Sequence, residues 1–373
     1  MAKVNILKSS LFSAHGNLED TLKSIEENKL NLSSKSIETL DGIVEVPYFL
    51  FHQEMEENQD IIYKAIKNIV LELIVDLTSE QRKNTALLIG TSQIDLNIVN
   101  SIVDTLNNIK EFKSNKKSID NYAKKISDEL NLSGYTMTMS TACTSSANAL
   151  LEAQNLISAN IFKYVLVLGV EVHTSIMCSG FNSLRLLSLG KQTPFSKERD
   201  GLVLGEGLAG VLIGEEDSTW SLEGGYSNAN SYTITASGVD GDEFYDVMNK
   251  ALKILKLDSK DITALKSHAT SSVSNDLSEI NAISRIFDKD IVFTSLKPYV
   301  GHTLGACGIL ELVLFMAGID KGFVHKTINV GEPILDDYKP ITKDYICTNG
   351  TFMLNYFGFA GNNVSIIIIK KNI

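Results

Sequence analysis

Long apolar runs are absent from this 373-residue sequence, and proline and tryptophan are rare in it, with five and one residues. The longest apolar stretches, 312–317 and 366–369, are far too short to span a bilayer, which takes about 20 residues. The first eight residues, Met-Ala-Lys-Val-Asn-Ile-Leu-Lys, hold no apolar core of a signal peptide. We therefore expect no membrane span and no secretory leader.

Cysteine is too scarce and too scattered to build a disulfide framework or a metal cluster. Cys143, Cys178, Cys307 and Cys347 show neither paired nor metal-ligand spacing. We therefore expect no metal site, and we expect the chain to work in the reducing cytoplasm.

Positive charge is in deficit, because 34 Lys and Arg stand against 45 Asp and Glu, a formal net charge of −11. General nucleic-acid binding needs a basic face and is therefore not expected. An acidic protein partner would have to dock on a local basic patch. The length and the apolar content of 44% suit two core-bearing halves or one large α/β unit.

Short apolar or β-branched runs alternate with helical apolar patterns, which predicts an α/β protein with mostly parallel sheets. Polar, Ser-rich residues 29–41 are expected to form a surface connection, and a break at 215–219 separates two halves. The expected strands are 4–7, 85–89, 135–140, 164–170, 208–213, 220–224, 291–295, 351–356 and 364–369. The expected helices are 17–27, 56–77, 96–109, 118–130, 145–158, 243–255, 276–286 and 306–319.

The stretch from Tyr135 to Leu150 holds the first candidate for chemistry. A β-branched run ends in small residues, and Cys143 follows, before a Thr-Ser-Ser segment suited to capping a helix. A thiol at a helix N-terminus ionises more easily, because the helix dipole stabilises the thiolate that acts as nucleophile. The alternative is a small buried cysteine under a tight turn.

Three later loops carry residues that could serve such a nucleophile. The first, Lys-Ser-His-Ala-Thr-Ser-Ser, contains His268; the second contains Lys297 and, five residues on, His302; the third, 355–363, is a glycine-rich bend. Taken singly, each histidine is a hydrogen-bonded structural residue as readily as a catalytic one. The lysine alone suits a solvated or salt-bridged position, and the bend suits a tight turn.

Together these motifs resemble the β-ketoacyl-[acyl-carrier-protein] synthases, specifically the elongating enzymes with a Cys-His-His site. The matching segments are Thr-Ala-Cys-Thr-Ser-Ser, His-Ala-Thr-Ser, Lys-x-x-x-x-His and Phe-Gly-Phe-Ala-Gly, with a Pro-Phe-Ser-Lys-Glu-Arg-Asp-Gly block at 194–201. Their order and spacing match over residues 85–373. Residues 1–84 carry little of the resemblance, and the family's Gly-rich turn after the first strand is missing.

The resemblance implies a thiolase-like fold with five αβαβα layers, made of two similar halves, 1–216 and 217–373, and usually dimeric. It also implies a ping-pong reaction without metal or redox cofactor, on substrates carried by the phosphopantetheine arm of acyl carrier protein. Cys143 would take an acyl group, and malonyl-carrier would lose CO2 and attack that thioester. Fatty acid, polyketide and aryl-polyene-type pathways all remain open.

The resemblance also assigns roles. His268 and His302 would stabilise the enolate formed by decarboxylation, and the backbone N–H groups of Cys143 and Phe359 would form the oxyanion hole. Lys297 would tune the site electrostatically and orient one histidine. Glu279 would be its supporting carboxylate, paired with Lys297.

Some loop residues depart from the family pattern. Ala269, Ser271 and Ala360 stand where glycine is usual, and Ser272 replaces a threonine. These changes are tolerable in a loop unless the backbone requires a positive φ. Phe359 matches the family's aromatic gate, whose swing Ala360 would stiffen; alternatively it is a plain core aromatic.

Two further residues concern specificity and docking. Gln93 falls where the family keeps an apolar residue in the acyl tunnel, which predicts a polar or aryl-conjugated acyl chain, unless it lies on the surface. Arg185 resembles the arginine that docks the acidic carrier protein; its alternative is a solvent-exposed helix arginine.

Rival functions are distinguished by the same motifs. A thiolase would have a second cysteine in the loop held here by Phe-Gly-Phe-Ala-Gly, and a starter-type synthase would have asparagine at the position of His302. A chain-length-factor-like, non-catalytic partner of a heterodimer stays open because of the loop substitutions. The Cys143, His268, His302 and Lys297 set argues against it.

Overall fold

The computed structural model describes residues 3–39, 42–51, 59–93, 118–229 and 238–372. The helix expected at 96–109 and the start of the one expected at 56–77 lie outside these residues. Of that second helix, α2 spans Gln59–Leu73.

Eleven strands form one continuous hydrogen-bonded sheet in the order β12-β11-β15-β16-β10-β1-β9-β7-β5-β6, with β2 attached to β1. In chain order they are β1 Val4–Ser13, β2 Gly16–Asn17, β5 Thr85–Gly90, β6 Thr136–Met139, β7 Tyr164–Glu171, β9 Gly207–Gly214, β10 Trp220–Ala229, β11 Ala264–Lys266, β12 Phe293–Thr294, β15 Gly350–Phe357 and β16 Asn362–Lys370.

The sheet consists of two halves with the same strand arrangement. The first half has the spatial order β6-β5-β7-β9-β1, and the second half has the order β12-β11-β15-β16-β10. If the five strands of each half are numbered along the chain, both orders read 3-2-4-5-1. In both halves the second strand is parallel to the third and fourth, and the fifth is antiparallel to the fourth and first. The antiparallel pair β1–β10 joins the halves.

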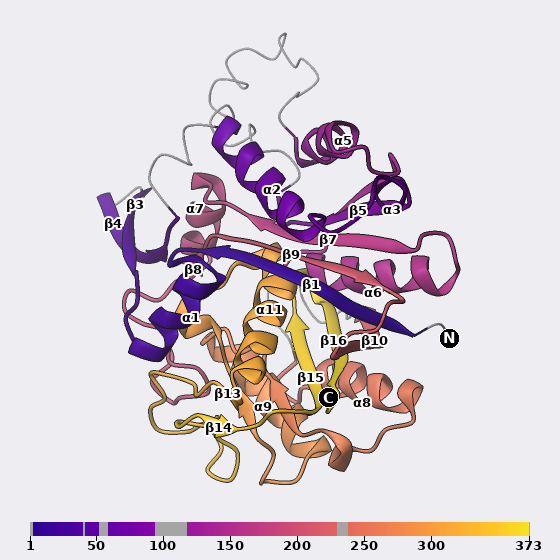
Figure 1. Ribbon diagram of the computed structural model, residues 1–373. Coiled ribbons are helices and arrows are strands. Elements are labelled where there is room, and N and C mark those ends of the chain that lie inside the picture. The colour runs from indigo at the N-terminus through magenta and orange to yellow at the C-terminus, as the bar shows by residue number, and fades with distance from the viewer. Residues whose placement is uncertain (1–2, 40–41, 52–58, 94–117, 230–237, 373) are drawn as a thin grey trace.

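Helices cover both faces of each half-sheet. Helices α2 and α5 (Ile119–Glu129) pack on the outer face of the first half, and α8 (Asp242–Leu255), with α9 (Val273–Ile286) beside it, covers the second. Helices α6 (Ser145–Ser158) and α11 (Cys307–Asp320) contact each other and strands of both halves (Figure 1). The five αβαβα layers expected from the family resemblance are confirmed.

The expectation of mostly parallel sheets is wrong, because the fifth strand of each half runs antiparallel to both neighbours. Strands β7 and β9 are buried along their whole length. Their sequences are continuously apolar because helices cover both faces of the sheet, and such cover buries antiparallel strands as fully as parallel ones.

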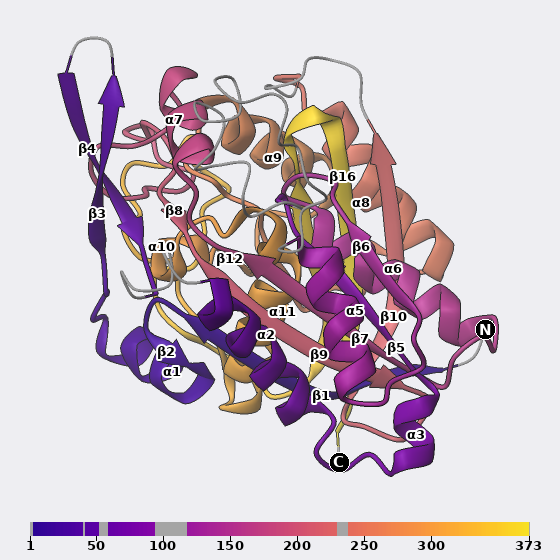
Figure 2. The ribbon, with the colours of Figure 1, turned by 90° about the horizontal axis from the view of Figure 1, so that it is seen from above.

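The surface connection expected at 29–41 is also wrong. Residues Ser33–Thr39 form β3, which pairs with β4 (Gly42–Phe49), and β4 is parallel to β8 (Leu204–Gly205). Figure 2 shows this β3–β4 ribbon standing at one side of the molecule. Ile37 is buried in β3 while its neighbours are largely exposed, so the strand lacks the apolar alternation that would identify it.

Shorter elements complete the fold. They are α1 Leu18–Glu27, α3 Ser79–Lys83, α7 Ser175–Ser183, α10 Lys297–Val300, β13 Phe323–Val324 and β14 Tyr345–Ile346. Within the described ranges, no helix is both long and apolar enough to cross a membrane.

Candidate active site

Cys143 lies in the connection between β6 and α6, two residues before the start of α6, which is a helix of the buried middle layer. Ala142 takes a left-handed conformation with φ 54°, which turns the chain sharply just before the cysteine. The Ser145 hydroxyl holds this turn by accepting from the Thr141 N–H at 2.9 Å and donating to the Ala142 carbonyl at 2.6 Å. The Thr-Ser-Ser segment therefore closes the turn, and the N-cap residue Thr144 makes no side-chain cap bond to α6.

The structure brings together the four residues predicted to act with one another. His302 Nε2 lies 3.1 Å from Cys143 Sγ, and the His268 ring meets the His302 ring edge-on at 5.3 Å between centroids. Lys297 Nζ lies 3.4 Å from His268 Nδ1. His268 comes from the loop after β11, whereas Lys297 and His302 come from the connection between β12 and α11.

The expectation that the Cys143 thiol ionises easily is wrong for this resting structure. Burial raises the pKa of Cys143 to about 11, against the lowering influence of Lys297 and of the backbone N–H groups of Phe359 and Cys143 itself. The pKa of His302 is held well below its usual range by burial and then by Lys297 and Lys266. The resting pair is therefore a neutral thiol and a neutral imidazole.

Lys297 determines which nitrogen of His268 carries hydrogen. An ammonium group can only donate, so the contact at 3.4 Å makes Nδ1 the acceptor and leaves the hydrogen on Nε2. Burial, Lys297 and His302 together hold the pKa of His268 well below its usual range. His268 is therefore a neutral ring with an Nε2–H donor.

The predicted pairing of Glu279 with Lys297 is wrong. The carboxylate partner of Lys297 is Glu311, which is fully buried on α11. Glu279 instead accepts from the backbone N–H groups of His268 and Ala269, each at 2.7 Å. Burial raises the pKa of Glu279 to about 7. Glu279, which was expected to be the partner, and Glu311 are both carboxylates, and only tertiary packing shows which of them pairs with Lys297.

The His268 loop passes through two left-handed residues, Ala269 with φ 43° and Ser271 with φ 66°. Two carboxylates of α9 hold it there, because Asp276 accepts from the Ser271 N–H at 3.1 Å and Glu279 holds the preceding turn. The positive φ that would make glycine preferable is thus present at both positions.

The glycine bend lies against the cysteine loop. A Cβ at Gly358 would meet the Asn362 carbonyl oxygen at 3.1 Å and the Cys143 nitrogen at 3.4 Å. Asn362 Oδ1 accepts from Asn148 Nδ2 at 2.7 Å, which ties the bend to α6. The bend thereby brings the Phe359 N–H to the thiol, as the oxyanion-hole prediction requires.

Two cavities meet at Cys143. One, of about 250 Å³, is lined by mostly apolar side chains, among them Met177, Phe181 and Leu304. The other, of about 20 Å³, is lined by His268, His302, Thr270 of the His268 loop, and Ser274 and Asn275 at the start of α9. Phe359 lines both, and its ring stacks on Phe181 with centroids 5.7 Å apart.

Gln93 is not among the residues that line the apolar cavity, whereas its neighbour Ser92 is. The Gln93 side chain donates from Nε2 to the Val172 carbonyl at 3.3 Å. The polar acyl chain predicted from Gln93 therefore gains no support from the lining of this cavity.

Arg185 lies just beyond the end of α7, exposed and in a left-handed conformation with φ 56°. It is the neighbour of Leu184, which lines the apolar cavity. The residue therefore stands on the surface at the side of the cavity that holds α7.

Three buried charged residues in this region were given no role in the sequence analysis: Lys266, Glu171 and Glu311. Lys266 shares Glu311 with Lys297, and Glu171 accepts from the Ser92 and Gly305 N–H groups at 3.0 and 2.8 Å. Glu171 thereby fastens loops of both halves beside the cavity. A sequence signal for Glu311 exists, because it interrupts the apolar run Ile309–Phe315 of a helix.

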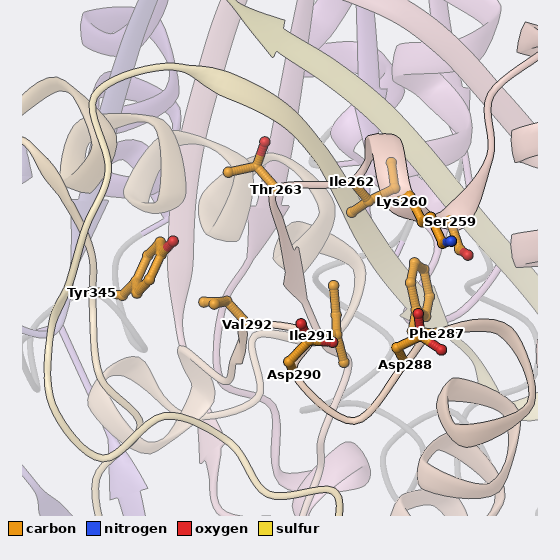
Figure 3. Close-up of a pocket in the computed structure, with 10 residues that line it drawn as sticks. All are labelled: Ser259, Lys260, Ile262, Thr263, Phe287, Asp288, Asp290, Ile291, Val292 and Tyr345. Carbon is orange, nitrogen blue, oxygen red and sulfur yellow. The ribbon is translucent and has the colours of Figure 1, made fainter.

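A larger cavity, of about 380 Å³, lies elsewhere in the second half and contains none of the predicted site residues (Figure 3). Ile262, Phe287 and Val292 contribute apolar surface, and Lys260, Asp288 and Asp290 contribute charge. No nucleophile–base pair lines it. Across the described part of the chain, no cluster of three His, Cys, Asp or Glu side chains could hold a metal ion.

The fold is a thiolase-like scaffold that brings one cysteine, two histidines and a lysine together, and comparison with known proteins gives the family. Residues 49–218 match the N-terminal domain of β-ketoacyl synthases and residues 221–331 match the C-terminal domain. The chain belongs to the β-ketoacyl synthase family.

Relatives and solved structures agree. The chain is 31% identical to the chloroplastic 3-oxoacyl-[acyl-carrier-protein] synthase I of Hordeum vulgare over 256 residues, covering 63% of this chain and 55% of that protein. It thus spans little more than half the length of this curated relative. A β-ketoacyl synthase from Burkholderia phymatum superposes with a TM-score of 0.87 at 22% identity, covering 100% of both chains. A ketosynthase complex with its chain length factor from Xenorhabdus doucetiae gives 0.81 at 22%, covering 99% of this chain and 98% of that one.

Proposed function

We propose that the protein is a β-ketoacyl synthase that catalyses decarboxylative condensation of a Cys143-bound acyl group with malonyl-acyl-carrier protein. The observation that carries this proposal is the contact of 3.1 Å between Cys143 Sγ and His302 Nε2, beside a His268 ring fixed as an Nε2–H donor. A division of the chain at residues 216 and 217 fits it, because the repeat unit changes between β9 and β10.

The first half-reaction is acyl transfer. As Sγ attacks the carrier thioester, its proton passes to His302 Nε2, and from there to the departing pantetheine sulfur. The carbonyl oxygen becomes an oxyanion, which the N–H groups of Cys143 and Phe359 stabilise without reorganisation. Proton transfer within a neutral pair suits a thiol whose pKa is raised to about 11.

The second half-reaction is condensation. Malonyl thioester enters on the histidine side, its C–C bond to the carboxylate breaks, and CO2 leaves. The electron pair forms an enolate whose oxygen accepts from His268 Nε2–H and from His302 Nε2–H, because neutral His302 carries its single hydrogen on Nε2 in this step, once the thiol proton has left with the pantetheine. The enolate carbon then attacks the Cys143 thioester carbonyl and the C–S bond breaks. The β-ketoacyl product forms, and the departing thiolate takes up one proton from solvent to restore the Cys143 thiol.

Phe359 suits the role of a gate between these steps. It lines the apolar cavity that would hold the acyl chain and also the smaller cavity beside the histidines. Movement of one ring can therefore open one side while it closes the other. The ring rests on Phe181 in the present conformation.

Acyl carrier protein is the proposed partner, with a second ketosynthase-like chain in a homodimer or heterodimer. Exposed Arg185 beside the cavity offers a positive charge to an acidic carrier. Arg185→Glu should raise the KM for acyl-carrier and leave acyl transfer from a small thioester unchanged. Equal effects on both substrates would count against docking at this residue.

The finding that Cys143, Cys178, Cys307 and Cys347 are all free thiols suits a reducing compartment such as the cytoplasm.

Intact-protein mass measurement tests the proposal directly. Incubation with an acyl-carrier should add one acyl mass, and Cys143→Ala should abolish the adduct. Addition of malonyl-carrier should then discharge the adduct as a β-ketoacyl-carrier. No adduct on the folded protein, even with a second ketosynthase present, would reject an acyl-accepting Cys143. The chain-length-factor alternative is not favoured, because Cys143, His302, His268 and Lys297 form an unbroken series of contacts.

A further inference from the structure

Lys266 is a completely buried lysine to which neither the motifs nor the proposed reaction gives a role. Its ammonium group pairs with Glu311 Oε2, donates to the Asn355 carbonyl at 2.8 Å and lies 3.7 Å above the centre of the Tyr356 ring. Every one of these contacts is inside the protein. A lysine is seldom placed there without a compensating reason, because desolvation of its charge is costly.

The charges around Glu311 do not balance. Lys297 pairs with Oε1 of this carboxylate and Lys266 with Oε2, so two ammonium groups share one negative charge. The other nearby carboxylate, Glu279, is occupied by two backbone N–H groups of the His268 loop. With Glu311 and Lys297 alone the pair would be neutral, whereas Lys266 gives the cluster a net positive charge.

This excess charge reaches both histidines. Lys266 contributes to the lowered pKa of His268 and of His302, after burial and Lys297. The titratable groups that face Lys266 are Glu311 and Cys307 on α11, Lys297 on α10, Tyr356 on β15, Glu279 on α9 and the two histidines. Of these, Glu311 is the carboxylate that pairs with the Lys266 ammonium group.

We propose that Lys266 is a positioning residue for condensation: it shares Glu311 with Lys297, so that Lys297 keeps enough positive charge to hold His268 as a neutral Nε2–H donor and to favour the enolate. The inference rests on the proposed function for its catalytic part. Its electrostatic part concerns the histidine alone and can be tested without any turnover.

The effect of Lys266 on the two histidines depends on pH, because Lys266 acts on them only while it is protonated. Burial lowers the pKa of Lys266 to about 8, although Glu311 opposes the shift. Burial likewise works against the charge on Lys297, but Glu311 and Cys307 together raise its pKa, so Lys297 stays charged when Lys266 loses its proton. As the pH rises through about 8, the excess charge of the cluster should therefore fall to zero.

Histidine NMR tests the electrostatic part. In protein with 13C- and 15N-labelled histidine, the resonance that His268→Gln removes identifies His268 among the six histidines. Lys266→Met should raise the His268 pKa so that proton binding tightens on the order of tenfold, because one nearby positive charge is lost. Lys197→Met, which removes an exposed lysine paired with Glu332, should leave this titration unchanged.

The wild-type protein supplies a second measurement in case Lys266→Met does not fold. The wild-type His268 ring resonances should show an inflection near pH 8 as Lys266 titrates. Absence of this inflection, or an unchanged His268 titration in folded Lys266→Met, would overturn the proposal. A shift of the unfolding midpoint without either NMR change would assign Lys266 a purely structural role.

Decarboxylation of malonyl-carrier tests the catalytic part. The wild-type decarboxylation rate should fall above about pH 8. The Lys266→Met rate should not show this fall, and at pH 7 it should be on the order of tenfold lower than that of the wild type. If the rate of the variant also fell above pH 8, the catalytic role proposed for Lys266 would be wrong. If Cys143 takes no acyl group at all, the proposed function fails while the NMR result still decides the electrostatic inference.

Discussion

The two halves of the molecule share one strand order and have opposite chemistry at the equivalent loops. After the third strand of the first half, the loop between β6 and α6 presents Cys143 and no charged residue. After the third strand of the second half, the equivalent connection presents Lys297 and His302. The loops after the second strands differ in the same sense, since Ser92 follows β5 and His268 follows β11.

The middle-layer helices show the same division. Helix α6 carries Glu152, which is partly exposed, whereas α11 carries Glu311 fully buried between two lysines. In the proposed reaction the first half therefore provides the nucleophile and an apolar cavity, and the second half provides the proton donors and the buried charges. Because the two halves repeat one scaffold, their equivalent loops lie close together at the site. The loops of each half can therefore carry different residues and still contact one another.

The largest effect should follow from removal of the buried carboxylate on which the second half depends. Glu311→Gln keeps the shape of the side chain but leaves Lys266 and Lys297 buried without a counter-charge. Loss of one partner of a buried ion pair typically costs about 3–5 kcal/mol, so the free energy of unfolding in urea should fall by this amount. Condensation should be lost with it.

A matched control is available on the surface. Glu332→Gln removes the carboxylate of an exposed pair with Lys197 and should leave the urea midpoint unchanged. If Glu311→Gln were as stable as Glu332→Gln, the buried ion pairs of Glu311 with Lys266 and Lys297 would contribute nothing to stability. The buried charge on α11 would then not distinguish the two halves energetically.

Much of the site was predictable from the sequence because its chemistry is local. Cys143, His268, Lys297 and His302 each stand in a short motif at the end of an apolar run, and fold repetition brings such loop ends together. The alternation of strands and helices likewise indicated an α/β fold. Strand direction was not predictable, since full burial by helices gives parallel and antiparallel strands the same apolar sequence.

The errors share a physical cause, namely interactions between segments far apart in the chain. Glu279 and Glu311 are both carboxylates, and only the tertiary fold shows that Glu311 of α11 is the one that pairs with both Lys266 and Lys297. The raised pKa of Cys143 follows from burial of the thiol, which a sequence motif does not indicate. The burial of Lys266 likewise follows from packing, and this lysine was given no role in the sequence analysis.

A smaller effect should distinguish the two histidines, because His302 alone of the pair contacts the thiol. At pH 7, His302→Gln should slow iodoacetamide alkylation of Cys143 about 10- to 100-fold, since the proton acceptor is lost. His268→Gln should change this rate less than about threefold. In wild type the rate should keep rising above pH 9, because the thiol pKa is about 11.

Mass mapping of the alkylated cysteine keeps this measurement specific, with Cys143→Ala as the blank. Equal slowing by both histidine variants would mean that the histidines act on the thiol as one unit. That result would contradict the division between a proton acceptor for Cys143 and an enolate donor fixed by Lys297.

The smallest effect concerns the backbone of the His268 loop. Ala269 has φ 43°, a conformation that costs an alanine roughly 1–2 kcal/mol and costs glycine almost nothing. The greater freedom of glycine in the unfolded chain offsets part of this gain, so Ala269→Gly should raise the free energy of unfolding by up to about 1 kcal/mol. Ser271→Gly, at φ 66°, should act in the same direction.

The same substitution inside a helix should have the opposite sign. Ala282→Gly, within α9, should lower the free energy of unfolding by about 1 kcal/mol, because glycine is the poorer helix residue. Urea unfolding of both variants beside wild type gives the comparison. Destabilisation by Ala269→Gly equal to that by Ala282→Gly would mean that the contacts of the Ala269 methyl group outweigh its backbone strain. The loop would then be held by packing as well as by Glu279 and Asp276, and its departure from glycine would be stabilising.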